Sequence, residues 1–538
     1  MIRAPSSARN RFGRLVFSLA VWLCGWAVPA VYAATCHPLP DLSSWYGQGI
    51  GLDIRNTRYQ RHATLYRDNV SNLEVAWIFG LDGGDSPHSW FEVSRDTVFV
   101  ASPGGVVYAL DKATGCIRWQ RHYESGIRTG LTRGDLGSGL HVLWFGTGGG
   151  IVWAINARNG DVLWKVDARE HPFNWLTGTP TFVDDRLYVP VSSMELGVAV
   201  NPLYGCCTSR GSLVALNAAT GKLLWRTPVI DEAPQVSGRH LLLVKQWGPS
   251  GAPVWSAPTV DPDSNRIYIG TGENYTHPTS TSSDAIIAID RDTGKKAWTQ
   301  QYTGGDAFNL ACTIHFNHPN CPDEPGPDLD FGAPPILTAT ADGAPMILAG
   351  QKSGDVHALV AATGEKLWSV NLGRGGYLGG VHWSMALHEG MRALFVPISD
   401  IPLGVAKGEA KPGLYALSTD DGRVLWRAPL TPGCANKEPC RDGMSAGITA
   451  TDELVFATAL DGRFQVHDAR TGDVLFTHDT WQSFEAVNGV PTAGGTIDVH
   501  GPYVAGDMVF LQSGYGSFGQ KGGNALIAYR LKAGSAPH

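Results

Sequence analysis

Hydrophobic and polar positions follow one pattern that recurs seven times along the chain. Each copy starts with a mostly apolar run, continues through a short polar turn that ends in Gly, and closes with an aromatic residue four positions after the Gly. Apolar residues at every second position predict a half-buried strand, and the Gly predicts a tight turn with positive φ. The pattern therefore predicts seven strand–turn–strand units, at VYALDKATGCIRW (107–119), VWAINARNGDVLW (152–164), LVALNAATGKLLW (213–225), IIAIDRDTGKKAW (286–298), VHALVAATGEKLW (356–368), LYALSTDDGRVLW (414–426) and FQVHDARTGDVLF (464–476).

The spacing of the copies predicts one repeated architecture. Roughly 45 to 75 residues separate successive copies, which is enough for a four-stranded blade with loops of variable length. Each closing aromatic ring is expected to cover the sheet of a neighbouring unit. An eighth unit is predicted from the two ends, where LEVAWIFGL (73–81) supplies a strand to pair with ALIAYRL (525–531). We predict an all-β protein whose residues 34–538 form a single eight-bladed β-propeller.

Residues 1–33 have the features of an export signal. Four Arg stand among the first 14 residues, an apolar stretch covers 15–31, and a small-residue cleavage site ends at Ala33. An uncleaved membrane anchor is the alternative, but polar and helix-breaking residues interrupt the apolar stretch. No later stretch approaches the ~20 apolar residues of a spanning helix. We predict export to the periplasm without stable membrane insertion.

The charge of the chain argues against a nucleic-acid partner. The full chain has 42 Lys and Arg against 49 Asp and Glu, for a net charge of −7. The predicted signal holds four of the Arg and no carboxylate, so the remainder carries a net charge of −11. No basic stripe is available to neutralise phosphates.

The cysteines predict disulfides in an oxidising compartment. Nine Cys become eight once the predicted signal is removed, and an even number suits disulfide bonding. The sequence leaves the connectivity open. Cys312 and Cys321 are close in sequence, as are Cys434 and Cys440; Cys206 and Cys207 are adjacent, and Cys36 and Cys116 remain. No C-x-x-C-H sequence occurs, so no covalently attached c-type haem is expected.

The repeat with its closing Trp resembles the propeller of the quinoprotein dehydrogenases, although non-catalytic assembly propellers of the bacterial envelope share the same repeat. A more detailed similarity is to the polyvinyl alcohol dehydrogenase family. It rests on NTRYQ (56–60), CCTSRGSLVALNAATGK (206–222), WSAPTVDP (255–262), GTGENYTHPTSTSSDAI (270–286), NCPDEPGPDLDFGAPPIL (320–337), AGQKSGDV (349–356) and VNGVPTAGGTIDVHGPYVAGDMVFLQSGYG (487–516). The resemblance implies pyrroloquinoline quinone (PQQ), a divalent cation and a separate cytochrome c or similar acceptor.

The resemblance also implies roles for particular residues. Trp255 matches the Trp that stacks on the cofactor, with another blade-packing Trp as the alternative. Glu195 matches the glutamate that binds the metal, and the second ligand is expected to be Asn274, with Glu273 in reserve. Lys352 matches the cation at the quinone edge, or else it is a surface lysine. Further cofactor contacts are expected from Arg128, which suits carboxylates, and from Thr177, Ser193, His382 and Trp383.

Two features depart from the family pattern. In related alcohol dehydrogenases the adjacent Cys pair precedes the metal glutamate, whereas here Cys206 and Cys207 follow it; they are expected to cover one face of the cofactor or to be merely structural. The usual catalytic Asp position is occupied by Asn309, so Asp306 is the predicted base. Ala311 stands where lanthanide-dependent relatives carry an extra Asp, which favours calcium.

The sequence thus supports a periplasmic PQQ dehydrogenase that oxidises secondary alcohols, with a polymeric alcohol as one option. Two alternatives remain open. One is an envelope scaffold propeller without catalysis. The other is a protein that binds PQQ without turnover, because Asn cannot accept a proton as a carboxylate does.

Overall fold

The strand–turn–strand units form antiparallel four-stranded sheets in the computed structural model, which describes residues 36, 38–40, 42, 44–241, 243–314, 317–401 and 408–532. The chain divides into two units, 1–35 and 36–538. The predicted export signal belongs to the first unit and lies outside the described residues. Among the residues described here, no helix has the length and apolar character needed to cross a membrane.

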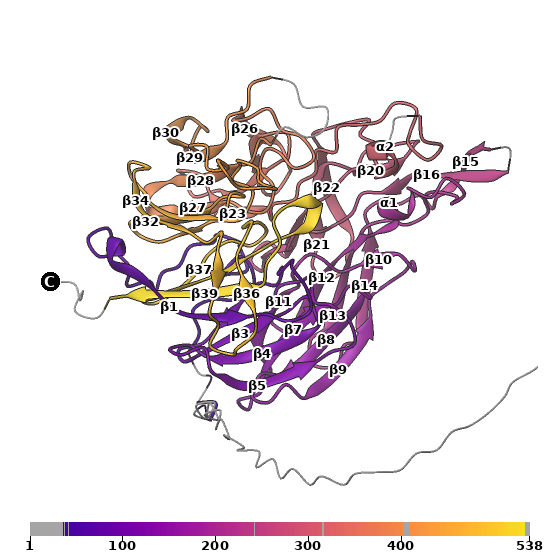
Figure 1. Ribbon diagram of the computed structural model, residues 1–538. Helices are drawn as coiled ribbons and strands as arrows, with labels where there is room; N and C mark the ends of the chain where they lie inside the picture. Colours follow the sequence, from indigo (N-terminus) through magenta and orange to yellow (C-terminus); the bar gives the residue numbers. More distant parts are fainter. Residues whose placement is uncertain are drawn as a thin grey trace, which may run out of the picture. The chain divides into compact units, whose positions relative to one another are not determined.

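Eight blades make up the second unit (Figure 1). From the innermost to the outermost strand, blades 1 to 4 are β2 (Glu92–Val93), β3 (Thr97–Ala101), β4 (Val106–Asp111), β5 (Ile117–His122); β6 (Thr132–Asp135), β7 (His141–Gly146), β8 (Ile151–Asn156), β9 (Val162–Asp167); β11 (Thr181–Val183), β12 (Arg186–Ser193), β13 (Ser212–Asn217), β14 (Leu223–Pro228); and β18 (Thr259–Asp261), β19 (Arg266–Gly270), β21 (Ala285–Asp290), β22 (Lys296–Gln301).

Blades 5 to 8 follow in the same order. They are β23 (Ile336–Ala339), β24 (Pro345–Gly350), β25 (Asp355–Val360), β26 (Lys366–Asn371); β27 (Ala386–His388), β28 (Ala393–Ile398), β29 (Gly413–Ser418), β30 (Val424–Pro429); β31 (Thr449–Ala450), β32 (Leu454–Thr458), β33 (Arg463–Asp468), β34 (Val474–Asp479); and β37 (Tyr503–Ala505), β38 (Met508–Ser513), β39 (Ala525–Leu531), β1 (Leu73–Gly80).

Short elements decorate the blades. β10 (Asn174–Trp175) pairs with the end of β12, and three two-stranded ribbons are added between blades. The ribbons are β15 (Gln235–His240) with β16 (Val244–Gly248), β17 (Ser250–Gly251) with β20 (Asn274–Thr276), and β35 (Ser483–Phe484) with β36 (Thr492–Ala493). The helices are α1 (Glu195–Val198), α2 (Ala311–Ile314), η1 (Val70–Asn72), η2 (Glu389–Met391) and η3 (Ser517–Gly519).

The two ends of the propeller close the ring, as predicted. β1, in indigo, pairs antiparallel with β39, in yellow, so that Leu73 lies opposite Leu531 and Gly80 opposite Ala525 (Figure 1). The N-terminal strand thereby becomes the outermost strand of blade 8. This pairing leaves no open edge between the first and last blades.

Each of the six Trp residues that close a copy of the repeat, and Trp77 of β1, docks on the next blade. Its indole N–H donates to the carbonyl oxygen three residues before the Gly of that blade, at N···O distances of 2.9–3.2 Å. A Cβ at Gly115 would lie 2.7 Å from the Trp77 ring, so only Gly lets the ring approach. The seven turn glycines have φ between 70° and 79°, as the pattern predicts. Phe476, the seventh closing aromatic residue, has no indole N–H to donate. Its ring instead packs against the Tyr529 ring of blade 8, with the two ring centroids 6.3 Å apart.

An N-terminal strap covers one end of the propeller axis. Residues 46–60 bond in turn to the inner strands of all eight blades, from Tyr46 N to Val93 O in blade 1 to Gln60 Nε2 and Val504 O in blade 8. Buried Arg58 donates to Ile50 O, Ile448 O and His500 O. The strap lies on the same face as the Gly turns, called the hairpin face below. The axis is therefore closed at this face, and the longer connections lie at the other one.

Candidate functional site

Connections at the face opposite the strap enclose a cavity of about 630 Å³. Its lining comes from segments spread between residues 128 and 518, which meet only because the blades surround one axis. Eight residues singled out from the sequence line this cavity: Arg128, Thr177, Ser193, Trp255, Glu273, Lys352, His382 and Trp383.

Three carboxylates meet one lysine on the cavity wall. Oxygen atoms of Glu273, Asp328 and Asp330 lie within 4.8 Å of one another. The Lys352 ammonium donates to Asp328 Oδ1 at 2.8 Å and to Asp330 Oδ2 at 2.9 Å. We call these four residues the acidic cluster. All four are at least nine-tenths buried, so one positive charge faces up to three negative charges with little solvent to screen them.

Asp330 is the best-stabilised anion of the cluster. Besides Lys352, it accepts hydrogen bonds from Trp255 Nε1 and from Glu273 N, both at 2.9 Å. Burial opposes its ionisation, but Lys352 and these hydrogen bonds outweigh burial and hold its pKa below the ordinary value. The same carboxylates outweigh burial at Lys352 and raise its pKa.

The other two carboxylates are less well compensated. Burial raises the pKa of Asp328 well above its ordinary value, even though Lys352 acts in the opposite direction. Burial also raises the pKa of Glu273, and Asp330 and Asp328 add to the shift. Glu273 Oε2 is buried without a hydrogen-bond partner among the described residues. A proton or a cation is needed to satisfy this oxygen.

Aromatic rings form the wall beside the acidic cluster. Trp255 and Trp383 meet edge to face, with ring centroids 5.2 Å apart, and His382 lies 5.8 Å from Trp255. Lys352 Nζ lies 5.3 Å from the centre of the Trp255 ring. Burial, together with Lys352, lowers the pKa of His382 to about 3, so the imidazole is neutral. A flat ligand at this wall would contact ring faces and edges instead of water.

Arg128 supplies a second cation to the cavity. Its Nε donates to Thr177 Oγ1 at 3.0 Å and its Nη2 to Tyr515 Oη at 3.3 Å. In the part of the chain that the structure describes, no carboxylate lies within ion-pair distance of Arg128. The guanidinium can therefore take an anionic group of a ligand, since hydroxyls leave its charge uncompensated.

Glu195, the predicted metal ligand, does not belong to the acidic cluster and does not line the cavity. Its carboxylate accepts hydrogen bonds from Ser209 N at 2.6 Å, Tyr204 Oη at 2.7 Å and Thr208 N at 2.9 Å. These donors fill its oxygens and tie down the turn after the Cys pair. Asn274 is also engaged, donating to Ser250 O and accepting from Ser280 N, so Glu273 is the member of this pair that faces the cavity.

The residues predicted for proton abstraction lie behind the cavity wall. The Asp306 carboxylate accepts from Asp328 N at 3.2 Å and from Leu329 N at 2.9 Å, and thus holds the segment that carries the two aspartates. Asn309 donates to Tyr275 O at 2.9 Å and to Asn320 O at 2.8 Å. Neither residue lines the cavity.

All four cysteine pairs noted in the sequence form disulfides. The Cys206–Cys207 bond does not line the cavity. It belongs to an apolar cluster with the Cys312–Cys321 bond, Tyr275 and Phe308, and the last two do line the cavity. The adjacent disulfide therefore supports the wall from behind.

Sequence reasoning missed Asp328 and Asp330. Both stand in the stretch NCPDEPGPDLDFGAPPIL, and their spacing of two suits side chains on one side of an extended segment. This D-x-D signal was available, but a search for a Gly-Asp pattern leads to Asp306 instead. Tyr275, Phe308 and Tyr515 were also missed, because aromatic residues are common outside the repeat and carry no local signature.

Two family models match the chain. One, described as outer membrane protein assembly factor BamB, matches residues 71–240 and 352–536. The other, described as the β-propeller domain of glucose, ethanol and alcohol dehydrogenases, matches residues 196–313. The first omits residues 241–351, which contribute Trp255, Glu273, Asp328 and Asp330 to the cavity. The assembly-factor match therefore spans the repeat and cavity residues such as Arg128 and Lys352, but not three of the four residues of the acidic cluster.

Curated relatives and solved structures agree with the dehydrogenase match. Polyvinylalcohol dehydrogenase of a Pseudomonas species is 35% identical over 512 residues, covering 92% of this chain and 78% of the relative. The enzyme of that name from Sphingopyxis sp. (strain 113P3) is 36% identical over 504 residues, with coverages of 92% and 76%. Quinohemoprotein alcohol dehydrogenase from Comamonas testosteroni has the same fold, with a TM-score of 0.64, 19% identity, and coverages of 91% and 81%. The chain is therefore an enzyme that belongs to the PQQ-dependent quinoprotein alcohol dehydrogenases, in the polyvinyl alcohol dehydrogenase family.

Proposed function

We propose that this protein is an exported dehydrogenase that oxidises a secondary alcohol, including a polymeric one, with PQQ and calcium in the cavity. Electrons would leave to a separate acceptor such as a cytochrome c. The observation that carries the proposal is the acidic cluster beside Trp255 in a cavity that also presents Arg128. The polymeric substrate is proposed by analogy with the relatives, which are polyvinylalcohol dehydrogenases.

The cavity has the groups that PQQ requires. Trp255 offers a ring face, Lys352 offers an ammonium for a quinone oxygen, and Arg128, which has no carboxylate partner among the described residues, offers a guanidinium for a cofactor carboxylate. When bound, PQQ supplies the quinone that accepts the hydride from the carbinol carbon. The protein then has to orient the alcohol, exclude water and accept the hydroxyl proton.

The acidic cluster also suits calcium. Hard cations prefer oxygen ligands, and Glu273, Asp328 and Asp330 offer carboxylate oxygens within 4.8 Å of one another. Glu273 Oε2, which has no hydrogen-bond partner in the described part of the chain, would gain one. We therefore assign the metal to Glu273 and its neighbours instead of to Glu195 and Asn274. Because no haem motif occurs in the sequence, the acceptor is assigned to another protein or segment.

Asp330 is the base in this proposal. A base must be ionised before the substrate arrives, and Lys352 holds the pKa of Asp330 low. A cation bound at the acidic cluster would favour the ionised form of Asp328, which accepts a hydrogen bond from Lys352 and is the alternative base. Asp306 then acts through the backbone N–H groups of Asp328 and Leu329, as a positioning residue.

Reconstitution tests the proposal. The purified protein is incubated with PQQ and CaCl2, desalted, and assayed for dye reduction with 2,4-pentanediol. We expect retained quinone absorbance and activity, with loss of both when calcium is chelated before PQQ is added. Retained PQQ without activity would favour a protein that binds PQQ without turnover. If PQQ is not retained, the result would favour the envelope scaffold propeller without catalysis.

A further inference from the structure

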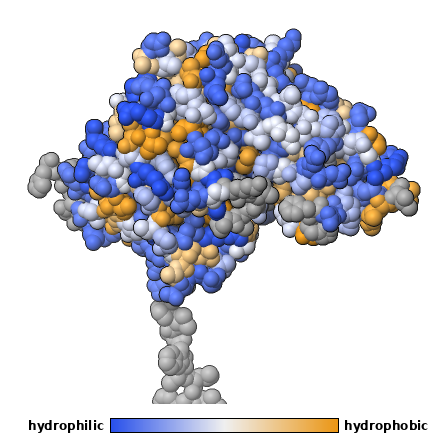
Figure 2. Space-filling view, turned by 90° about the horizontal axis from the view of Figure 1, so that it is seen from above, coloured by the Kyte–Doolittle hydropathy of each residue, from blue (hydrophilic) through white to orange (hydrophobic). Residues whose placement is uncertain are grey.

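Exposed large apolar side chains of this protein fall into two groups. One group lies on the outer strands, directly before the closing aromatic residue of the repeat: Val162, Leu163, Leu223, Leu224, Leu367, Val424, Leu425 and Val474. These follow from the repeat itself. Figure 2 shows that hydrophobic side chains gather in patches on a mostly hydrophilic surface. The second group lies outside the repeat and needs another explanation.

Five members of the second group lie on segments that line the cavity or continue from its lining. Met194 is 43% exposed and Phe518 53%, and both line the cavity. Ile314 is 57% exposed and follows Thr313, another lining residue. Val200 and Leu203, 40% and 73% exposed, lie on the segment after α1. We call these five residues the apolar rim. Other exposed apolar residues outside the repeat lie on the β15–β16 ribbon and at Tyr66, Val75 and Val487.

The segments that carry the rim are held together. Leu310 N donates to Leu196 O at 3.1 Å, which joins the start of α2 to α1. The Asn320 amide donates to the carbonyl oxygens of Ala199, Asn201 and Tyr204 at 2.9–3.1 Å. Val200, Leu203 and Ile314 therefore belong to joined segments that continue from the cavity-lining residues Leu196, Leu310 and Thr313, and their side chains are partly exposed to water.

We propose that the apolar rim is a subsite for the chain of a polymeric secondary alcohol. This inference rests on the proposed function: one carbinol group enters the cavity, and neighbouring methylene groups lie along the rim. Such a polymer has an aliphatic backbone with hydroxyls at intervals, so it can bury carbon on the rim while its hydroxyls stay in water. Each methylene group removed from water strengthens binding by about fourfold.

The rim is expected to act on binding and not on chemistry. Contacts far from the reacting carbon are equally strong in the ground state and in the transition state, so they lower KM and leave kcat unchanged. For the wild-type protein, KM per chain should therefore fall as the oligomer lengthens beyond the cavity. For 2,4-pentanediol, which fits within the cavity, rim residues outside the lining should have no effect.

The test uses the double variant Leu203→Ser with Ile314→Ser, because neither residue lines the cavity. We expect KM for polyvinyl alcohol to rise about 15-fold, the loss of two methylene contacts, with kcat and the 2,4-pentanediol kinetics unchanged. Leu223→Ser is the matched control, since it removes a side chain that is 49% exposed on the outer strand β14. Unchanged thermal unfolding would show that both variants fold.

Several outcomes would overturn the inference. If 2,4-pentanediol is oxidised and the double variant keeps the wild-type dependence of KM on oligomer length, the apolar rim is not a polymer subsite. The proposed function would then remain intact. A change seen only with a protein acceptor in place of the dye would assign the rim to that acceptor. If no alcohol is oxidised, equilibrium binding of polyvinyl alcohol to the wild type and to the double variant is compared. Equal affinities would reject the proposal that the apolar rim binds the polymer chain.

Discussion

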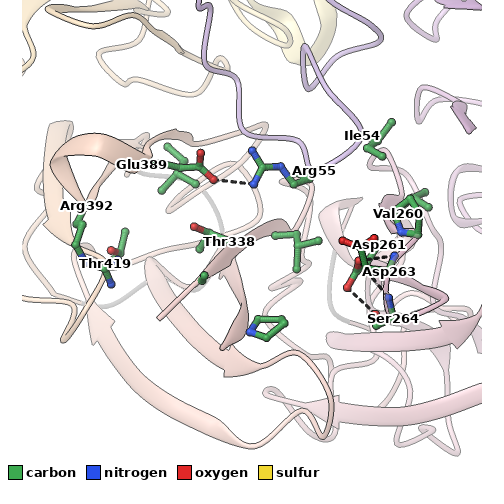
Figure 3. Close-up of a pocket in the computed structure, with 15 residues that line it drawn as sticks. Ile54, Arg55, Val260, Asp261, Asp263, Ser264, Thr338, Glu389, Arg392 and Thr419 are labelled. Atoms are coloured by element: carbon green, nitrogen blue, oxygen red, sulfur yellow. Dashed lines mark hydrogen bonds and ion pairs between the residues drawn. The ribbon is translucent and has the colours of Figure 1, made fainter. Parts of the chain in front are cut away.

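Two hollows at opposite faces of the propeller differ in how their charges are satisfied. The groove on the hairpin face measures about 800 Å³ and lies beneath the strap residues Ile54 and Arg55 (Figure 3). Its Arg55 pairs with Glu389 at 2.7 Å, and its Asp261 accepts from Ser264 Oγ at 2.6 Å. The smaller cavity at the opposite face holds the acidic cluster, an unpartnered Glu273 oxygen and an Arg128 without a carboxylate partner among the described residues.

The comparison shows that unmet charge marks a functional site better than size does. A folded chain can pair its surface charges at little cost, as it does around the groove. Burying three carboxylates around one ammonium is unfavourable in the ligand-free protein, so such an arrangement is expected where a ligand completes it.

The largest effect is expected from Asp330→Asn compared with Glu389→Gln. The first removes the proposed base in the cavity, and general bases contribute about 10²–10⁴-fold to a rate. We expect kcat for 2,4-pentanediol to fall by that factor with PQQ still bound. Glu389→Gln breaks only a half-exposed ion pair, so activity should not change and stability should fall by less than about 1 kcal/mol. Comparable losses in both variants would contradict the comparison.

Lys352→Met should have the next largest effect, on stability. Removing the only cation of a buried cluster leaves its carboxylates uncompensated, which costs about 3–5 kcal/mol. In the wild type, the lowered pKa of Asp330 contributes stability that is present above its unfolded pKa and is lost as pH falls. The difference between wild type and variant should therefore shrink on acidification. Because the ordinary pKa of Asp330 is 3.8, this loss occurs below that pH, and urea unfolding at pH 7 and pH 3 measures it.

Lys366→Met is the control for this prediction. Lys366 lies exposed on the outer strand β26, so its loss should change stability by less than about 0.5 kcal/mol at either pH. A difference for Lys352→Met that is equally large at both pH values would show that the carboxylates are not the cause.

A smaller effect is expected for Asp306→Asn, and it concerns pH. Burial raises the pKa of Asp306 to about 6 from an ordinary value of 3.8. The folded protein thus holds this proton more tightly than the unfolded chain, so wild-type stability should fall as pH rises between these values. The contribution is at most about 3 kcal/mol. Asn does not titrate, so the stability of the ligand-free variant, measured by urea unfolding, should lack this fall with rising pH. Parallel curves of stability against pH for the two proteins would reject the prediction.

Much of the fold could be predicted because its signals are local. Period-two apolar positions, a Gly with positive φ and an aromatic residue four positions later specify strand, turn and docking ring within thirteen residues. ALIAYRL has the first strand of the pattern without the turn and closing aromatic residue, and LEVAWIFGL can supply the missing strand. This predicted that the two ends pair. The site was predicted only in part: Trp255, Lys352 and Glu273 do line the cavity, whereas Glu195, Asp306 and Asn309 lie behind its wall.

The sequence by itself determined that eight similar units form a closed ring, because each unit encodes its own strands and its contact with the next. Only the tertiary structure decided which carboxylates face the cavity. Glu195 and Asp306 have oxygens filled by backbone N–H groups from distant turns, while Asp328 and Asp330 meet Lys352 across a loop. A carboxylate's role depends on which donors reach it in space, and no local spacing along the chain records that.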